Sequence, residues 1–334
     1  MLPVKDAGDY LAEAVASILA QEQVTLELLI IDDHSKDQAI SQLKIDSRCR
    51  VLRSPGSGLV DALNYGLAQA RYGCIARMDA DDIAHPTRLA TQLQYMSQHP
   101  EVDICGCVVA MFSEVEVAQG YQHYEKWINS LLTHEQIVRD FFIESPIAHP
   151  SAVFNKALIQ SIGGYQQGDW PEDYELWCRA LMQGCKFGKP CSQPLLYWRD
   201  YPTRTSRTDS RYRKRAFIQC KAHALADQLR TQNIQNVLIW GTGPTGLALH
   251  DALESEQCEV NGFVDISPKM AGRYKRGKSV HVVNLETDTI TPATLLNPHQ
   301  HLLVAVAARG AREQMRSYLG AHGWEETKHY TLAA

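Results

Sequence analysis

The sequence predicts an α/β protein whose first domain has a parallel sheet and whose second, smaller domain is also α/β. Short apolar runs alternate with amphipathic segments in the first half, and two of these runs end in acidic residues. A new strand, glycine turn and helix pattern begins near residue 237. Strands that alternate with helices are typical of parallel sheets. At 334 residues the chain is also longer than most single cores, which favours two domains.

The elements of the first half are expected in close succession. Residues 11–19 carry apolar side chains at helical spacing, and residues 26–31 form a short apolar run typical of a buried parallel strand. We also expect strands at 51–52 and 74–78 and helices at 59–70 and 86–97, the second of which has Pro86 near its first turn.

The second half begins after a polar stretch, residues 199–207, which we expect to be a loop. The elements expected beyond it are a helix at about 210–231, a strand at 237–240, a helix that includes 247–253 and a strand at 262–264. We place the domain boundary near Arg215, which gives domains 1–215 and 216–334, with the helix as the connector.

Composition excludes several classes of protein. The formal net charge of −5 argues against general nucleic-acid binding. No apolar run approaches the ~20 residues of a membrane-spanning helix. The nine cysteines include no zinc-like spacing, and Cys105 and Cys107 beside an apolar run are expected to be buried strand residues. An odd cysteine count without a leader predicts a cytoplasmic protein, soluble or peripheral at the inner face of a membrane.

Two strand ends are acidic. Asp79, Asp81 and Asp82 follow the strand at 74–78, and carboxylates at such a position project into the crevice where ligands bind. Two carboxylates one residue apart, Asp79 and Asp81, could hold Mg²⁺ or Mn²⁺ against a diphosphate, or the acids could cap the following helix. Asp32 and Asp33 follow another apolar run, where a simple turn is the alternative. Two acidic ends in one sheet favour a shared cleft.

Four segments carry a family resemblance. In order, spacing and residue type they resemble glycosyltransferase family 2, the inverting enzymes with a GT-A (nucleotide-diphospho-sugar transferase) fold; the segments are 32–37, 58–67, 76–82 and 86–89. The resemblance implies that the chain is a metal-assisted glycosyltransferase acting in glycan assembly, that its donor is a nucleotide-diphosphate sugar, a UDP-sugar first of all, and that the acceptor is a glycan or lipid-linked.

The resemblance also assigns roles at the donor site. Asp33 would accept a hydrogen bond from the donor base, with Asp32 in support, and Val4 would touch the nucleotide through its backbone. Asp79 would contact the ribose or the metal, and Asp81 would be the principal ligand of Mn²⁺ or Mg²⁺.

The first strand departs from the family pattern. Relatives have several apolar residues before the position of Pro3, whereas this chain begins with Met1 and Leu2. An unpaired position in the middle of a sheet is costly, so the gap needs an explanation. Either the start codon is placed too late, which we favour, or another segment fills the gap.

The catalytic base is expected at Asp173, with Glu172 as second choice. An inverting transfer needs a carboxylate that takes the proton of the acceptor hydroxyl. Two acids after Pro171 also suit a helix N-terminus. The acceptor half of the family resembles residues 146–151, 163–165 and 172–179, which implies that Asp173 is the base and that His149 lines the site. Trp170 and Trp177 would form a sugar platform or pack in the core.

A basic stretch follows Tyr197. In relatives the loop after the acceptor helix closes over the diphosphate, and Arg204 or Arg207 could do so here. An anionic lipid surface is another possible partner, and a solvated linker is the alternative.

The C-terminal domain carries a GxGxxG pattern formed by Gly241, Gly243 and Gly246, with Asp265 at the end of the next strand. This context suits a Rossmann-like domain that binds NAD(P) or another nucleotide. Pro244 removes one amide from the turn, so a docking or structural role stays open. Residues 299–301 are expected to form a loop.

Two other functions remain alternatives at this stage. One is an NAD-dependent oxidoreductase or binding module built on the C-terminal glycine pattern. The other is a non-catalytic protein that binds nucleotide-sugars, if the short first strand disables the site.

Overall fold

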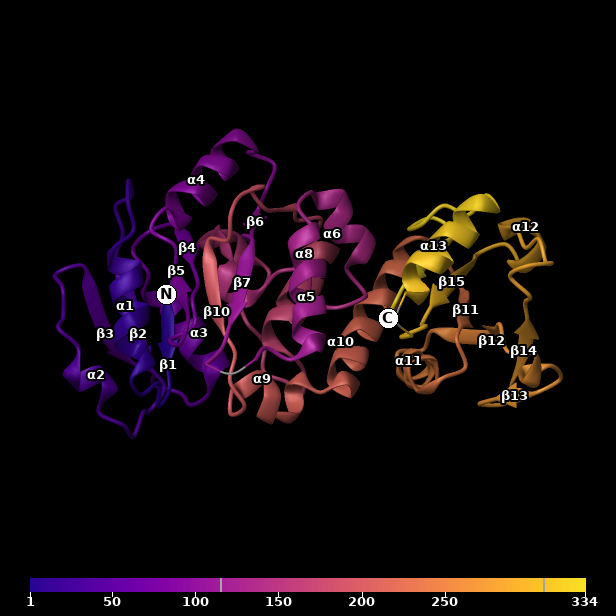
Figure 1. Cartoon of the computed structure of the whole chain (residues 1–334), viewed down its shortest axis with the longest axis horizontal. Coiled ribbons are helices and arrows are strands. Elements are labelled where there is room, and N and C mark those ends of the chain that lie inside the picture. The colour runs from indigo at the N-terminus through magenta and orange to yellow at the C-terminus, as the bar shows by residue number, and fades with distance from the viewer. Residues whose placement is uncertain (115, 309) are drawn as a thin grey trace. The chain divides into compact units, whose positions relative to one another are not determined.

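The computed structural model describes residues 1–114, 116–308 and 310–334, which form two compact units (Figure 1). The first unit comprises Met1–Ile137, Pro146–Gly168 and Glu175–Asp209. The second comprises Val138–Ser145, Asp169–Tyr174 and Ser210–Ala334. Two short segments from the first two hundred residues therefore belong to the second unit.

Short strands and helices alternate through the first 209 residues. In chain order they are β1 (Leu2–Val4), α1 (Tyr10–Leu19), β2 (Leu28–Asp32), α2 (Ala39–Gln42), β3 (Cys49–Arg53), α3 (Leu59–Gln69), β4 (Cys74–Ala76), β5 (Ile83–Ala84), α4 (Arg88–Gln98), β6 (Ile104–Cys105), β7 (Val109–Phe112), α5 (Gln119–Ser130), α6 (His134–Asp140), the 3₁₀ helix η1 (His149–Ser151), β8 (Val153–Asn155), α7 (Lys156–Ser161), α8 (Glu172–Met182), β9 (Phe187–Gly188), β10 (Leu196–Arg199) and α9 (Thr205–Thr208). Each helix and strand expected in this half is present within a few residues of its expected place.

Three small sheets organise the first unit. β1, β2 and β3 are parallel neighbours, so their carboxyl ends share one edge. A second sheet has the order β4-β8-β6-β9, and a third has the order β5-β10-β7. α3 packs on β1 and β2, and α1 packs on β5. The end of β10 meets the loop after β4, since the backbone amide of Arg199 donates to Asp82 Oδ1 at 2.9 Å.

The short strand β1 lies in the apolar core. Leu2 and Val4 are buried in one cluster with Leu28 and Ile30 of β2. On its other side the terminal ammonium of Met1 donates to the carbonyl of Ala76 at 2.8 Å, and the amide of Met78 donates to the carbonyl of Met1 at 3.2 Å. β1 therefore lies between β2 and the segment that ends in the acidic loop.

A buried glutamine ties α4 to the strands beneath it. The side-chain amide of Gln92 donates to the carbonyls of Cys105, Gly106 and Ser151 at 2.9–3.0 Å, and its oxygen accepts from Arg88 Nε at 3.1 Å. Gln92 is 0% exposed. All its polar atoms are satisfied inside the protein, as burial requires.

Gln92→Leu is expected to lower the free energy of unfolding by about 3 kcal/mol. The substitution leaves Arg88 Nε and the three buried carbonyls without this hydrogen-bond partner. Urea unfolding of the full chain measures the effect. The control is Gln94→Leu, an exposed position on the same helix, which should change the stability little. Equal effects of the two substitutions would contradict this account of α4.

Lys189, which follows β9, has a buried amine without a carboxylate at hydrogen-bond distance among the described contacts. Its Nζ donates to the carbonyls of Ile128 and Pro146, both at 2.7 Å. Burial lowers the pKa of Lys189 to about 7. The unfolded chain then binds more protons than the folded chain between about pH 7 and the ordinary lysine range, so this group makes stability rise with pH there.

Lys189→Met is expected to remove that rise. Urea unfolding at pH 7 and at pH 9 gives the change in the free energy of unfolding with pH for each protein. The contribution of Lys189 is the difference between the change in the wild type and the change in the variant. Identical pH dependences would show that Lys189 titrates normally in the folded protein.

The second unit contains a larger sheet. From Ser210 onward the elements are η2 (Ser210–Tyr212), α10 (Lys214–Thr231), β11 (Asn236–Trp240), α11 (Pro244–Ser255), β12 (Glu259–Asp265), η3 (Pro268–Met270), β13 (Tyr274–Lys275), β14 (Lys278–Val282), α12 (Pro292–Leu295), β15 (Gln300–Val304), α13 (Ala311–Ala321) and β16 (Tyr330–Leu332). The order is β13-β14-β12-β11-β15-β16, and every pair except β13–β14 is parallel.

Two local predictions were wrong. Residues 299–301 are not all loop, because β15 begins at Gln300 and His301 is buried, with its Nε2 2.9 Å from the hydroxyl of Thr331. Burial lowers the pKa of His301 to about 4, so a neutral ring occupies the strand. Residues 199–207 are not all loop either, because Arg199 ends β10 and α9 begins at Thr205.

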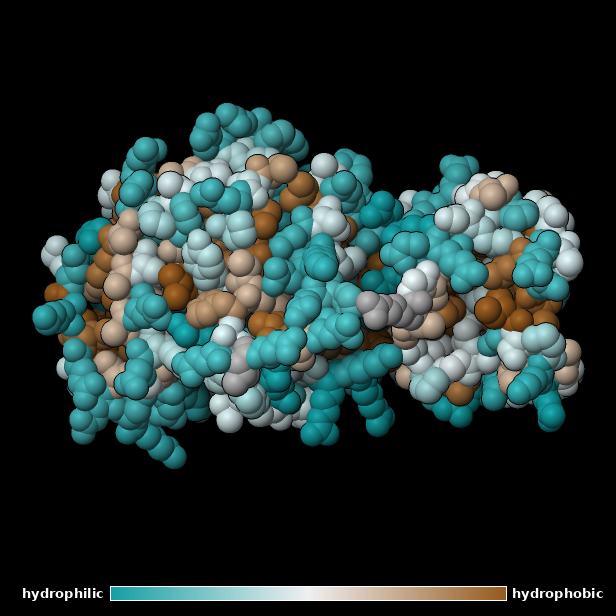
Figure 2. All heavy atoms as spheres, viewed as in Figure 1, coloured by the Kyte–Doolittle hydropathy of each residue, from teal (hydrophilic) through white to brown (hydrophobic). Residues whose placement is uncertain are grey.

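The surface is polar over most of the face in view. Figure 2 shows hydrophilic side chains over much of it, with apolar patches between them. No helix in the described ranges is both long enough and apolar enough to cross a lipid bilayer.

Candidate functional site

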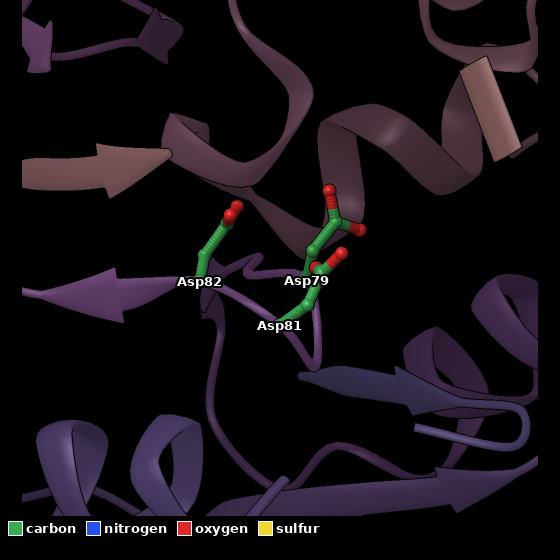
Figure 3. Close-up of side chains that lie close together, drawn as sticks. All are labelled: Asp79, Asp81 and Asp82. Atoms are coloured by element: carbon green, nitrogen blue, oxygen red, sulfur yellow. The ribbon is translucent and has the colours of Figure 1, made fainter. Parts of the chain in front are cut away.

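Three aspartates lie together in the loop between β4 and β5. One carboxylate oxygen each of Asp79, Asp81 and Asp82 lies within 4.8 Å of the others. Figure 3 shows the three side chains on this loop, with the carboxylates of Asp79 and Asp81 close to each other. The strand before the loop is short and apolar and ends against β1, so the chain turns here at the edge of the core.

Asp79 is held by two arginines. Nη2 of Arg77, a side chain only 2% exposed, lies 2.5 Å from Asp79 Oδ1, and Nη2 of Arg204 lies 3.9 Å from Oδ2. Burial alone would raise the pKa of Asp79, but the charges of Arg77 and Arg204 outweigh it and lower that pKa. Asp79 is therefore the member of the group that stays ionised most readily.

Asp81 has a different set of partners. The hydroxyl of Tyr201 donates to Asp81 Oδ2 at 2.8 Å, and Nε of Arg199 donates to the backbone carbonyl of Asp81 at 2.8 Å. Burial and the neighbouring charge of Asp79 raise the pKa of Asp81. A nearby cation would relieve both effects.

Asp82 is the most buried of the three, at 1% exposure. Its Oδ1 accepts from the backbone amide of Arg199 at 2.9 Å, whereas its Oδ2 has no hydrogen-bond partner among the described residues. Burial and the charges of Asp81 and Asp79 raise the pKa of Asp82 well above its ordinary value.

These residues fit a hard divalent cation. Three carboxylates supply the oxygen ligands that Mg²⁺ and Mn²⁺ prefer, and one buried carboxylate oxygen still lacks a partner. Burial and the repulsion between neighbouring carboxylates raise the pKa of two of the acids, and a divalent cation would offset both effects. Asp81 and Asp79 remain the proposed ligands, and the carboxylate of Asp82 lies beside them.

The ends of β1 and β2 form a second polar cluster. The amide of Asp33 donates to the carbonyl of Val4 at 2.8 Å, which places these two residues side by side. Asp33 is buried, and its carboxylate accepts from the amide of Gly58 at 2.7 Å and from Lys5 Nζ at 3.2 Å. Asp32 Oδ1 accepts from the amide of Ser35 at 2.8 Å, which stabilises the turn after β2.

The two candidate arginines lie in different environments. Arg204 is buried, its guanidinium lies 4.6 Å from the ring centroid of Trp198, and it faces Asp79. Arg207 instead pairs with Asp200 at 2.6 Å and lies over the ring of Tyr121. Of the two, Arg204 is the one brought to the acidic loop.

His149 is buried in an aromatic cluster. Its Nε2 lies 2.9 Å from the hydroxyl of Tyr165, and its ring meets that of Trp177 edge-on at 6.0 Å. The ring of Trp177 is 0% exposed and also packs on Phe154, so it is a core residue and not a sugar platform. A protonated His149 would help to lower the pKa of Asp79, after the larger effects of Arg77 and Arg204.

Glu172 and Asp173 begin α8 and belong to the second unit. Glu172 is 2% exposed, and its Oε2 accepts from the hydroxyl of Tyr212 at 2.6 Å. Burial, with the charges of Glu172 and Asp173, raises the pKa of Tyr212. Asp173 is the more exposed of the two acids.

The glycine turn of the second unit lies between β11 and α11. Gly241 has a φ of 124°, and a Cβ at Gly246 would overlap the carbonyl oxygen of Gly241, so both positions need glycine. A Cβ at Gly243 would meet open space. The carboxylate of Asp265, at the end of β12, accepts from the amides of Thr242 at 3.0 Å and Ser267 at 2.9 Å.

Three residues of the acidic site were missed at the level of sequence. They are Arg77, Asp82 as a member of the carboxylate group, and Tyr201. Arg77 could have been found, because it stands in the expected strand, two residues before Asp79, and alternate side chains of an extended chain share a face. Tyr201 is 120 residues away from Asp81, and no local pattern relates the two.

Known proteins resemble this chain over most of its length. The family described as "Glycosyl transferase family 2" matches residues 1–163. The "O-antigen biosynthesis glycosyltransferase WbnJ" of Escherichia coli is 30% identical over 237 residues, which cover 69% of this chain and 87% of that protein. The "Bifunctional glycosyltransferase pgtA" of Dictyostelium discoideum is 26% identical over 265 residues, 68% of this chain.

The fold also has solved counterparts. The crystal structure of S. aureus TarS superimposes with a TM-score of 0.52 at 15% identity, over 76% of this chain. The chain spans only 34% of the length of the Dictyostelium protein and 48% of the TarS chain. At this identity the likeness to TarS concerns the fold alone.

Proposed function

This chain belongs to glycosyltransferase family 2, and from that premise we propose that it moves a sugar, with inversion, from a nucleotide-diphosphate sugar to a hydroxyl of a glycan or lipid-linked acceptor. The observation that carries the proposal is the group of three carboxylates on the β4–β5 loop, with Arg204 beside it. A UDP-sugar is the donor we favour, because a relative from Escherichia coli, 31% identical over 188 residues, is described as "UDP-Gal:alpha-D-GlcNAc-diphosphoundecaprenol beta-1,3-galactosyltransferase".

The donor would lie along the carboxyl ends of the first strands, where ligands of α/β sheets bind. Asp33, supported by Asp32, would accept from the base, and the backbone at Val4 would contact the nucleoside. Asp33 is buried and already oriented by the amide of Gly58, so it need not reorganise on binding.

Asp81, with Asp79, would hold Mn²⁺ or Mg²⁺. The bound cation would neutralise charge that develops on the leaving diphosphate. Arg204 would bring a second positive charge to the leaving diphosphate. Its guanidinium lies over Trp198 and is already oriented beside the acidic loop. Arg207, paired with Asp200, would contribute to the loop and not to the diphosphate.

Asp173 would act as the base. It would take the proton of the acceptor hydroxyl as that oxygen attacks the anomeric carbon from the face opposite the leaving diphosphate. Glu172 is the weaker candidate, because it is nearly buried and its carboxylate already accepts from Tyr212. His149 would line the site.

An acceptor-free assay tests the proposal. Purified full-length chain is incubated with UDP-, GDP-, dTDP- and CMP-sugars and Mn²⁺, and release of the nucleotide is measured. We expect slow release from a nucleoside-diphosphate sugar, of the UDP type first, and its loss with EDTA. Absence of both release and donor binding across the panel would reject the proposal.

A second function, nucleotide binding by the second unit, is favoured by its sheet. The parallel strands have the spatial order β14-β12-β11-β15-β16, so the strand order reverses beside β11, directly before the glycine turn. This is the crevice at which Rossmann-like domains bind nucleotides. Lys214 Nζ donates to the hydroxyl of Thr245 at 2.5 Å in the first turn of α11, which adds positive charge there. NAD(P) is the candidate ligand, with Gly241, Gly243, Gly246 and Asp265 as its site.

Gly243→Asp separates this function from a structural role. Gly243 is the N-cap of α11 with a φ of −74°, so aspartate fits and should stabilise the helix. The negative charge of the introduced aspartate would repel a phosphate bound at this turn. We expect NAD(H) to bind the wild type by calorimetry and to bind the variant at least about tenfold more weakly. No binding to the wild type would leave the unit with a structural or docking role, and equal binding to both would show that NAD(H) does not bind at Gly243.

A further inference from the structure

We infer that Tyr201 is a positioning residue for Asp81, and that its hydroxyl keeps this carboxylate in the orientation in which it serves the cation. The inference rests on the proposed function. It assigns a role to a residue of the β10–α9 segment that makes no contact with the donor in the proposal above.

The contact itself is direct. The phenolic hydroxyl donates to Asp81 Oδ2 at 2.8 Å. Within the described part of the chain, Asp79 has arginine partners and Asp82 has a backbone amide, whereas the hydrogen bond to the Asp81 carboxylate comes from this neutral hydroxyl. The three carboxylates thus have three different kinds of partner.

A neutral partner has a physical consequence. Three carboxylates within 4.8 Å repel one another, so a side chain without a tether would turn away. An arginine or lysine at position 201 would hold Asp81 but would also compete with the cation for its charge. A hydroxyl orients the carboxylate and leaves its negative charge to the cation.

The tyrosine is itself supported from α1. Its ring lies 5.6 Å from that of Tyr10, and the guanidinium of Arg199 lies 4.3 Å from the Tyr10 ring centroid. Glu13, three residues beyond Tyr10 and so on the same helix face, pairs with Arg199. Arg199 in turn donates to the backbone carbonyl of Asp81 at 2.8 Å. Backbone and side chain of Asp81 are therefore fixed by one connected group.

Tyr201→Phe tests the inference, because it removes the hydroxyl and keeps the ring. Mn²⁺ binding to the full chain in the presence of UDP is followed by electron paramagnetic resonance of the free ion. We expect the Kd for Mn²⁺ to rise about tenfold, in the range found when groups that orient metal ligands are removed. The Mn²⁺ concentration for half-maximal donor hydrolysis should rise equally, while kcat at saturating Mn²⁺ stays within about twofold.

The control is Tyr197→Phe, a partly exposed tyrosine on β10, which should leave the Kd for Mn²⁺ unchanged. If Tyr201→Phe does not fold, Tyr10→Leu removes the ring support and should weaken Mn²⁺ binding in the same direction. Unchanged or tighter Mn²⁺ binding in folded Tyr201→Phe would overturn the inference alone. A wild type that binds UDP but no Mn²⁺ would overturn the metal part of the proposed function as well.

Discussion

Asp81→Asn is expected to lower sugar transfer by about 10³-fold, the size of effect that follows loss of a main electrostatic stabiliser of a transition state. The substitution keeps the size of the side chain and its hydrogen bond with Tyr201, but it removes the charge that would hold the cation. Steady-state kinetics with a UDP-sugar at a fixed, saturating Mn²⁺ concentration measure the loss. Mn²⁺ binding should weaken in parallel.

Glu101→Gln is the matched control, since it removes one carboxylate from an exposed position, 61% exposed, of the same unit. It should leave transfer unchanged. If Asp81→Asn retains more than about a tenth of the wild-type rate, Asp81 is not the principal ligand, because loss of such a stabiliser costs far more than tenfold.

Asp173→Asn is expected to lower kcat by about 10²- to 10⁴-fold, the usual contribution of a general base. Donor affinity should stay the same, because the residue is proposed to meet the acceptor hydroxyl and not the nucleotide. Transfer kinetics together with a calorimetric titration of UDP in Mn²⁺ measure the two effects separately.

Asp169→Asn serves as the control for that experiment. Asp169 is exposed and stands four residues earlier in the same segment, Asp169–Tyr174. A variant Asp173→Asn that binds the donor and transfers at the full rate would remove the base assignment. Glu172→Gln would then be tested, although the bond between Glu172 and Tyr212 makes a loss of stability the more direct expectation for it.

Much of the fold could be predicted from local patterns. β2, α3 and α4 were expected within two residues of their observed starts, because each has an apolar period that matches its structure. Cys105 and Cys107 are buried as expected, although only Cys105 lies in a strand, β6. The polar start of β15 could not be recognised, since His301 is accommodated by a contact with Thr331, which lies 30 residues away.

The candidate site was predictable in part. The acidic strand end could be found because carboxylates directly after a short apolar strand are typical of a ligand crevice. The structure differs from the expected single parallel sheet, since β4 pairs antiparallel with β8 and lies in a different sheet from β2. Apart from Arg77, the partners that distinguish its three carboxylates come from β10 and the segment after it, through long-range contacts that spacing does not encode. Sequence order also places Asp173 in the middle of the first domain, whereas Asp169–Tyr174 packs with the second unit.

The central claim is that the Asp79–Asp82 loop forms a cation-dependent site for a nucleoside diphosphate. Calorimetric titration of UDP into the full-length wild type, once with Mn²⁺ and once with EDTA, tests it most directly. The account predicts that UDP binds at least about tenfold more tightly with Mn²⁺, a coupling of about 1.4 kcal/mol or more. Equal UDP affinity under the two conditions, or no UDP binding with Mn²⁺, would contradict it.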